Sequence, residues 1–425
     1  TTLVSARLLN RSHQPNPSTQ QFFAHRPPNP WSPSPPPLPT TMFHSLHLFP
    51  LLFSLLLPLA LGYAPRDSVA VGSQFISAST GLPETLSGAN VVMKGKPWIP
   101  STNGTSPCPP LGEDGICDTF NEADARYFRG RGWNLIRLGV VWAGGQPTLS
   151  HSLEGRLDSD FERRLKDVLD LAHGHGIRVV LDLHQDAMGT SVCGEGLPVW
   201  YFSEHLPHLM GKPVVGIKST LTGDCSVTDF DGWAKFSSDP EYNVKNECCV
   251  QYNNPGGGWG QKLDPSVGVQ AAMAHLIGTE VGRSSYAAYV GLLAAAVADH
   301  PAAVGIELMN EPPILNFRVE EHKLYDLYEE CYDAVRSVSD ELAVGVADAG
   351  QVPRYAGDEH LSSSNKKWLE SATHLMYTFH WYGGGFPEFP TSLDNAAKRA
   401  AYMDAVPVLT EFHWDADQAD QATEA

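Results

Sequence analysis

The sequence predicts an α/β protein: a (β/α)8 barrel of the TIM type that lacks its eighth strand and carries a long insertion after the third. Apolar strand-like runs alternate with helix-like segments from about residue 88 onward, and this alternation is typical of a parallel sheet. Charged or polar residues follow these runs at their C-terminal ends, where barrels of this type place their functional groups. The 425 residues, 42% of them hydrophobic, are ample for one such barrel.

Seven segments are predicted as parallel strands because their apolar runs are nearly continuous, as expected for strands buried on both faces. They cover residues 89–93, 134–141, 177–183, 304–309, 342–347, 374–380 and 406–411. Apolar residues at helical spacing predict helices between them. These helices cover residues 119–132, 158–173, 285–299, 320–339 and 392–405.

Residues 187–283 interrupt this rhythm because they are rich in Gly, Cys, Trp and Asn and too long for an ordinary connection. We interpret them as an elaborated loop over the mouth of the barrel. Four apolar residues within it either line an apolar channel or pack the insertion onto the barrel: Phe202, Leu206, Leu209 and Met210.

No eighth strand is predicted after residue 411, since the sequence ends in DADQADQATEA. The barrel domain, residues 80–425, is therefore expected to be incomplete. Its first and seventh strands would then have unpaired edges, which favour poor folding and aggregation.

The first 63 residues are expected to lie outside the barrel. Residues 1–41 include PPNPWSPSPPPLP, and such a segment cannot bury enough apolar surface to offset its ordering entropy. We interpret it as a leader that is disordered or does not belong to the native protein. Met42 is followed by an apolar run that ends in small residues, which predicts a signal peptide over 42–63 and a secreted protein. A membrane anchor is the alternative, since the run is near the minimum length for spanning a bilayer.

The net charge of −19 argues against nucleic acid or anionic lipid headgroups as partners. It is compatible with a neutral ligand such as a sugar. The sequence shows no HExxH motif and no CxxC pair, so we expect neither a metal nor another cofactor.

Two glutamates, Glu311 and Glu411, end the fourth and seventh predicted strands and should point into the same mouth. Retaining hydrolysis of a glycosidic bond needs two carboxylic acids about 5 Å apart, one as acid and then base, the other as nucleophile. The acid needs a raised pKa, whereas the nucleophile must stay ionised. We predict that Glu311 is the acid/base and Glu411 the nucleophile.

Further polar residues at the strand ends would complete this site. Asn310 is placed to bind a sugar 2-hydroxyl, and Arg137 would hold Glu411 charged by a charge-assisted hydrogen bond. Tyr382 could contact the nucleophile. His184 and His380 could bind the sugar or the two glutamates.

The motifs IRLGVVW, LDLHQD, IELMNEPP, HWYGGG and VLTEF together resemble glycoside hydrolase family 5 over about residues 80–415. Within it, the chain most resembles the endoglycoceramidase group and its fungal-type relatives that act on glucosylceramide or sterol glucoside. NVVMKGKPW, the HQD triplet and GEGLPVW favour that group. The resemblance implies that Lys94 and Asp186 contact the sugar. It also implies retaining hydrolysis of a β-glycosidic bond in a glycolipid substrate, with peripheral membrane contact.

The chain departs from that group in two respects. Family members have an eighth strand with a Trp beneath the sugar, and the group has a C-terminal β-sandwich. Two alternatives therefore stay open: a secreted β-glucanase of the cellulase type that acts on a polysaccharide, and an inactive truncated fragment.

Overall fold

The computed structural model describes residues 2–4, 66–103, 119–192, 194–214, 235–239, 266–382 and 388–412. The predicted signal peptide lies outside these residues, and so does the predicted leader apart from residues 2–4. Within the described ranges, no helix is both long enough and apolar enough to cross a membrane.

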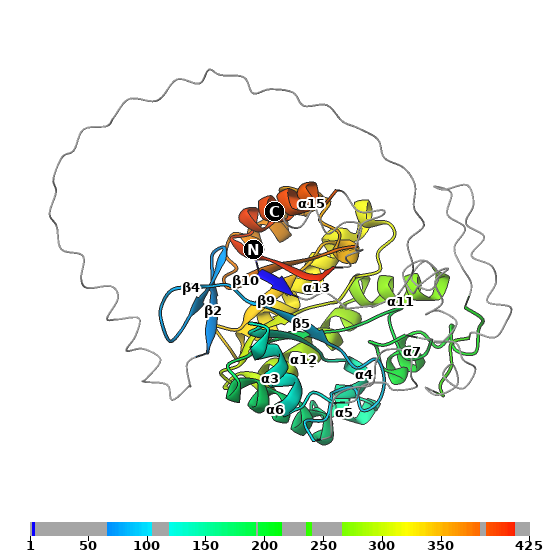
Figure 1. Ribbon diagram of the computed structural model, residues 1–425. Coiled ribbons are helices and arrows are strands. Elements are labelled where there is room, and N and C mark those ends of the chain that lie inside the picture. The colour runs from blue at the N-terminus through cyan, green and yellow to red at the C-terminus, as the bar shows by residue number, and fades with distance from the viewer. Residues whose placement is uncertain are drawn as a thin grey trace, which may run out of the picture. The chain divides into compact units, whose positions relative to one another are not determined.

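Seven parallel strands follow one another around a barrel in chain order, as predicted (Figure 1). Each pairs in parallel with the next. They are β5 (Ser87–Val91), β6 (Leu135–Gly139), β7 (Arg178–Asp182), β8 (Ala303–Glu307), β9 (Ala343–Val346), β10 (Leu375–Trp381) and β11 (Ala405–Phe412).

The place between β11 and β5 is taken by a three-residue strand, β1 (Thr2–Val4), which pairs in parallel with both neighbours. Leu3 lies opposite Leu409 of β11 and Ser87 of β5. The unpaired edges that the sequence predicts for the first and seventh strands are therefore a wrong prediction, because β1 pairs with both strands. An open edge presents unpaired backbone donors and acceptors, and even a short strand can satisfy some of them.

Helices on the outside of the barrel follow the predicted periodicity. In α6, the Asp158 side chain accepts hydrogen bonds from the backbone of Asp160 and Phe161, and Phe161, Leu165 and Val168 are buried. A helix with such a cap and such spacing buries one face against the strands. The outer helices are α3 (Glu122–Gly130), α6 (Ser159–Gly174), α12 (Glu280–Val297), α13 (Phe317–Arg336) and α15 (Phe389–Tyr402), with the shorter α14 (Ser363–Leu369). Of these, α13 and α15 begin without a side-chain cap.

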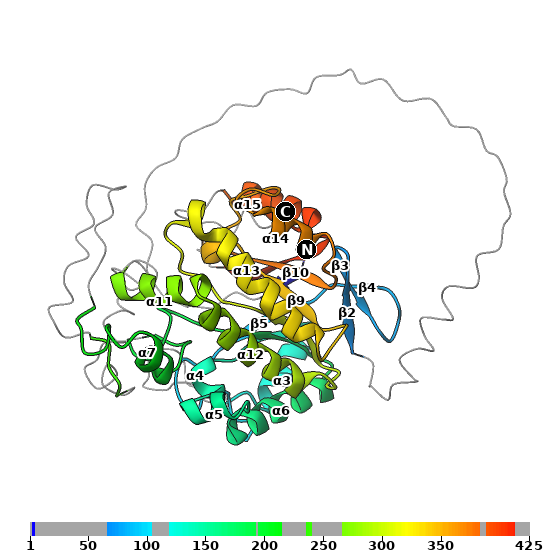
Figure 2. The same cartoon turned by 180° about the vertical axis from the view of Figure 1, so that it is seen from behind.

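A small antiparallel sheet, which the sequence did not predict, covers the N-terminal end of the barrel. It consists of β2 (Ser68–Val71), β3 (Gln74–Ser77) and β4 (Pro83–Glu84). Ala70 and Phe75 pack into one apolar cluster with strand residues such as Leu135 and Val406. Figures 1 and 2 place this sheet on one side of the barrel and the insertion helices on the other.

The insertion contributes α7 (Val199–His205) and α11 (Val267–Gly278), and two short helices, α4 (Trp142–Gly145) and α5 (Leu149–Leu153), precede α6. Phe202 and Leu206 are buried in the main core, and Leu209 and Met210 pack against it. Of the two roles considered for these four residues, the structure shows packing of the insertion.

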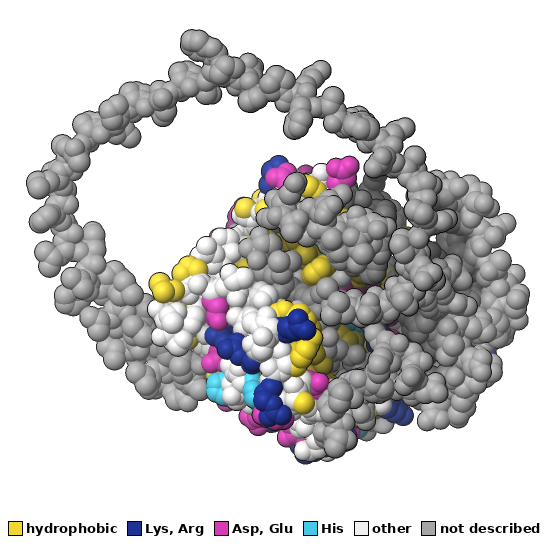
Figure 3. Space-filling model, in the orientation of Figure 1, with side chains coloured by type: hydrophobic (Ala, Val, Ile, Leu, Met, Phe, Trp, Pro, Cys, Tyr) yellow, Lys and Arg dark blue, Asp and Glu magenta, His cyan; other side chains and the backbone are white. Residues whose placement is uncertain are grey.

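Charges on the outer helices are largely paired with one another. Arg163 lies 2.8 Å from Asp167, and Lys166 lies 2.7 Å from Glu162, all on α6. Figure 3 shows acidic and basic side chains intermixed over this part of the surface. Exposed ion pairs of this kind contribute little to stability. The charges at the C-terminal ends of the barrel strands are buried instead.

Candidate active site

A fully buried arginine, Arg137 in the middle of β6, joins the polar groups at the mouth of the barrel. Its Nε donates to Glu307 at 2.5 Å, and its Nη2 donates to Asn310 Oδ1 at 2.8 Å. The same Nη2 lies 2.9 Å from Asp182, and Nη1 lies 3.6 Å from Glu411. Burial alone would lower the pKa of Arg137, but the carboxylates of Asp182, Glu307 and Glu411 raise it above its usual value. Arg137 therefore stays charged.

The Glu411 carboxylate, at the end of β11, is held in its ionised form. Burial would raise its pKa, but the charges of His380 and Arg137 and a hydrogen bond with Tyr382 lower it to about 2. The β10–β11 register shifts between Phe379 and His380, which brings His380 opposite Glu411. Such irregularities re-aim side chains next to functional sites.

Glu311 follows β8 in a left-handed backbone conformation, with φ of +38°. Its Oε1 lies 2.7 Å from His380 Nδ1. Its backbone N–H donates to Gln351 Oε1 at 2.7 Å, and its carbonyl accepts from Gln185 Nε2 at 2.9 Å. His380 therefore stands between the two candidate catalytic glutamates, in contact with one and opposite the other in the sheet register.

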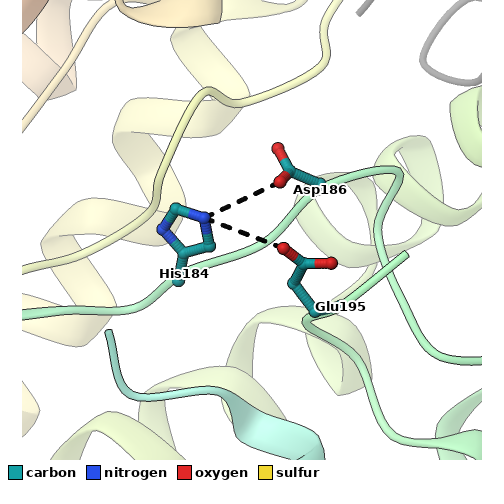
Figure 4. A group of neighbouring side chains, drawn as sticks. All are labelled: His184, Asp186 and Glu195. Atoms are coloured by element: carbon teal, nitrogen blue, oxygen red, sulfur yellow. Dashed lines mark ion pairs between the residues drawn. The ribbon is translucent and has the colours of Figure 1, made fainter. Parts of the chain in front are cut away.

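A second polar cluster lies beside the first and contains His184, Asp186 and Glu195 (Figure 4). His184 Nε2 lies 3.7 Å from Asp186 and 3.8 Å from Glu195. Lys94 Nζ forms an ion pair with Asp186 and lies 3.1 Å from Glu195. His184 Nδ1 is 2.6 Å from Asp182, whose other oxygen faces Arg137, so Asp182 connects the two clusters.

The two acids of this second cluster titrate far apart. Burial would raise the pKa of Asp186, but Lys94 and His184 hold it well below its usual range. Burial, reinforced by the charge of Asp186, raises the pKa of Glu195 to about 7. Burial would lower the pKa of His184, but Asp182 raises it to about 10. Two neighbouring carboxyl groups in one buried site are expected to separate in this way.

Two glycines bring Glu195 into this cluster. Glu195 and Asp186 exchange backbone hydrogen bonds of 3.0 and 3.1 Å. A Cβ at Gly194 would lie 2.0 Å from the Asp186 carbonyl oxygen, and Gly196 has φ of +126°. Glycine is therefore required on both sides of Glu195.

The same three side chains of Figure 4 could in principle hold a metal ion, since their ligand atoms lie within 4.8 Å of one another. The Lys94 ammonium already pairs with both carboxylates. A cation would have to displace Lys94, so we derive no chemistry from a metal at this position.

The Cellulase (glycosyl hydrolase family 5) model matches residues 101–214 and 263–425, which is more than half of the chain. The chain belongs to glycosyl hydrolase family 5.

Two curated relatives of this family 5 protein are endoglycoceramidases. That of Cyanea nozakii is 24% identical over 289 residues, which is 65% of this chain and 50% of the relative. That of Hydra vulgaris is 25% identical over 230 residues, 53% of this chain and 36% of the relative. The chain thus spans half or less of the length of these relatives. The crystal structure of an endogalactoceramidase shares the fold, with a TM-score of 0.57 and 21% identity, over 85% of this chain and 70% of that one.

The family 5 barrel brings every residue predicted for its site into these two clusters. The first holds Glu311, Glu411, Arg137, Asn310, His380 and Tyr382, and the second holds Lys94, His184 and Asp186. Four further buried residues of the site were not singled out from the sequence: Asp182, Glu195, Glu307 and Gln351. Asp182, Glu195 and Glu307 had a signal, since they lie in the LDLHQD, GEGLPVW and IELMNEPP motifs, whereas Gln351 lies in none of the quoted motifs.

Proposed function

We propose that this family 5 protein is a retaining glycoside hydrolase that cleaves the β-glycosidic bond of a glycolipid. The observation that carries the proposal is the contrast between its two strand-end glutamates. Glu411 is kept ionised by His380, Arg137 and Tyr382, as a nucleophile must be. Glu311 instead contacts the imidazole of His380 at 2.7 Å. Within the part of the chain that the structure describes, it forms no ion pair with an arginine or a lysine.

In the first step, the Glu411 carboxylate attacks the anomeric carbon and the C–O bond to the aglycone breaks. Glu311 donates its proton to the departing oxygen, so the aglycone leaves as an alcohol. Asn310, which Arg137 orients at 2.8 Å, is placed to bind the sugar 2-hydroxyl, a contact that strengthens in the transition state.

In the second step, water attacks the glycosyl ester on Glu411. The Glu311 carboxylate takes one proton from this water, and the Glu411 carboxylate is released. Both glutamates return to their starting protonation states. Two inversions at the anomeric carbon give a product with the configuration of the substrate.

The proposed substrate class is a glycosylceramide or a sterol glucoside. Its support is the likeness to two endoglycoceramidases together with the Lys94–Asp186 pair beside His184. These charged groups would bind sugar hydroxyls, and peripheral contact with a membrane would bring the lipid to the mouth. The match to a cellulase family model keeps a β-glucanase as the second candidate.

Parallel assays on glucosylceramide, a ganglioside, a sterol glucoside and carboxymethylcellulose test the substrate class. We expect sugar release from at least one lipid and not from the cellulose derivative. Activity on the cellulose derivative alone would favour the β-glucanase, and the absence of activity on all four would contradict a hydrolase. Proton NMR of the first-formed sugar tests the mechanism, because retention requires the β-anomer.

We also propose that the protein is secreted, on the basis of the apolar segment over 42–63. Expressed from Met42 in a eukaryotic host, it should reach the medium shortened by about 20 residues. Recovery of the intact segment in membranes after alkaline carbonate washing would favour the anchor instead. Recovery in the cytosol would contradict both locations.

A further inference from the structure

A buried glutamine, Gln351, connects the acid/base glutamate to the charged network beneath it. Its Oε1 accepts the backbone N–H of Glu311 at 2.7 Å. Its Nε2 donates to Glu307 Oε1 at 2.6 Å and lies 3.2 Å from Thr378 Oγ1 and 3.4 Å from Thr410 Oγ1. One side-chain amide thus reaches groups carried by β8, β10 and β11.

The two ends of this amide meet opposite demands. The Glu311 N–H needs an acceptor, and the Glu307 oxygen needs a donor. Only a side chain with both functions can supply them. Glu307 is itself held by Arg137 Nε at 2.5 Å. Glu307 therefore serves as the anchor that orients the amide, and Glu311 is the group that the amide fixes.

The backbone at both residues needs such fixing. Glu311 has φ of +38° and Gln351 has φ of +52°, both in the left-handed region that non-glycine residues rarely adopt. Residues in such conformations persist only where their surroundings hold them. The loop after β9 forms two hydrogen bonds to the backbone around Glu311. One is the bond from Glu311 N–H to Gln351, and the other is from Gly350 N–H to the Pro312 carbonyl at 2.9 Å.

We propose that Gln351 is a positioning residue for proton transfer, which sets the direction of the Glu311 side chain by holding its backbone. The inference rests on the proposed hydrolase reaction and deepens it. It assigns Gln351 to the acid/base function and not to the nucleophile. Gln351 accepts the Glu311 N–H at 2.7 Å, whereas on the nucleophile's strand it reaches only the neighbouring Thr410, at 3.4 Å, and Arg137 holds Glu307 independently.

A pair of aryl β-glycosides with the same sugar separates these two functions. A phenyl leaving group needs a proton as it departs, whereas a 2,4-dinitrophenyl group leaves as a stable anion. The value of kcat/KM reports the first chemical step for both. A misplaced Glu311 should therefore slow the phenyl glycoside and spare the dinitrophenyl glycoside.

The decisive variant is Gln351→Met, which keeps the length of the side chain and removes both hydrogen bonds. We expect kcat/KM to fall by about tenfold or more for the phenyl glycoside and by less than about threefold for the dinitrophenyl glycoside. The matched control is Gln146→Met. Gln146 is also a buried glutamine, whose Oε1 accepts from Trp142 Nε1 at 2.8 Å and bonds neither glutamate. Gln146→Met should therefore change kcat/KM for the phenyl and the dinitrophenyl glycoside by the same factor.

The conservative variant Gln351→Glu provides a second readout. Its introduced carboxyl can accept from Glu311 and, when protonated, donate to Glu307. The loss on the phenyl glycoside should therefore grow as the pH rises and the introduced group ionises against Glu307. This pH dependence decides the matter if Gln351→Met does not fold.

Equal losses on both glycosides in Gln351→Met, or losses in Gln351→Glu that do not depend on pH, would overturn the inference while the hydrolase stands. An unmutated protein that cleaves neither glycoside nor the lipids would instead contradict the proposed function itself.

Discussion

The Arg137 guanidinium lies 3.6 Å from the Glu411 carboxylate, whereas Glu307, Asn310 and Asp182 all bind it at 2.9 Å or less. Three contacts thus fix the plane of the guanidinium, and Nη1 is the nitrogen left to face Glu411. A planar group with several donors can be oriented in this way. The position of the Arg137 charge beside Glu411 is therefore set by these three partners and does not change when Glu411 gains or loses a proton.

Replacing Arg137 by lysine should weaken this arrangement, because one ammonium cannot satisfy three partners at fixed angles. The pKa of Glu411 should rise above about 2, so the nucleophile becomes protonated at a higher pH. The acid limb of the pH profile of kcat/KM should move upward, and the Tm should fall because buried carboxylates lose partners. Arg164→Lys, in an exposed pair on α6, is the control. An unchanged acid limb in Arg137→Lys would show that Arg137 does not act on Glu411.

The nucleophile assignment predicts a chemical rescue. Glu411→Ala should lose nearly all turnover, and added azide should restore part of it by attacking the anomeric carbon from the vacated side. The product would be a glycosyl azide of inverted configuration, which NMR identifies. Glu311→Ala should give an azide product of retained configuration, since azide then attacks the intermediate on Glu411. Residual activity near wild type without rescue would exclude Glu411 as the nucleophile.

The site residues predicted from the sequence share one property: they lie within apolar strand-like runs or directly after them. Arg137, Glu311 and Glu411 interrupt or end buried strands, and an ionised group there is costly unless it is paired. Parallel strands bring their C-terminal ends to one mouth, so proximity followed from the fold class alone. Chain order and periodicity were sufficient for this part of the site.

Gln351 and Glu195 were missed for a different reason. Both lie in loops whose paths depend on left-handed backbone or on glycines, Gly350 for one and Gly194 and Gly196 for the other. Hydrophobic periodicity carries no information on such turns.

Asp182 and Glu307 both pair with Arg137, which lies on a different strand and far from them in sequence. The sequence shows a polar residue in each apolar run, but it does not show which residue pairs with it. Likewise, three residues such as Thr2–Val4 are too few to form a pattern. Their pairing with β11 and β5 therefore had no signal in the sequence.

The pairing of Lys94 with Asp186 predicts a contribution to sugar binding. A hydrogen bond between a charged side chain and a buried hydroxyl contributes roughly 1.5–3 kcal/mol, equivalent to about a 10- to 150-fold change in rate. Asp186→Ala should therefore lower kcat/KM on a glycosylceramide or sterol glucoside by at least about tenfold. Asp170→Ala, at an exposed acid on α6, is the control. A loss of Tm with unchanged kcat/KM would show that Asp186 only holds the loop after β7.

The raised pKa of Glu195 predicts how stability depends on pH. Its pKa is about 7 in the folded protein, against 4.5 for an ordinary glutamate. Between these values the native state keeps a proton that the unfolded chain has lost, so the free energy of unfolding should fall as the pH rises from 4.5 to 7. The shift corresponds to a loss on the order of 3 kcal/mol.

Glu195→Gln keeps an amide in place of the protonated acid and should lack this fall. Urea unfolding of both proteins at several pH values between 4.5 and 7.5 measures this difference in the free energy of unfolding. The pKa of Glu321 is also raised, to about 8, but Glu321 titrates in both proteins, so its contribution cancels in the difference. Glu204→Gln, at an exposed position on α7, should behave like wild type. Parallel curves for wild type and Glu195→Gln would show that Glu195 is ionised throughout, and that Lys94 and His184 outweigh its burial.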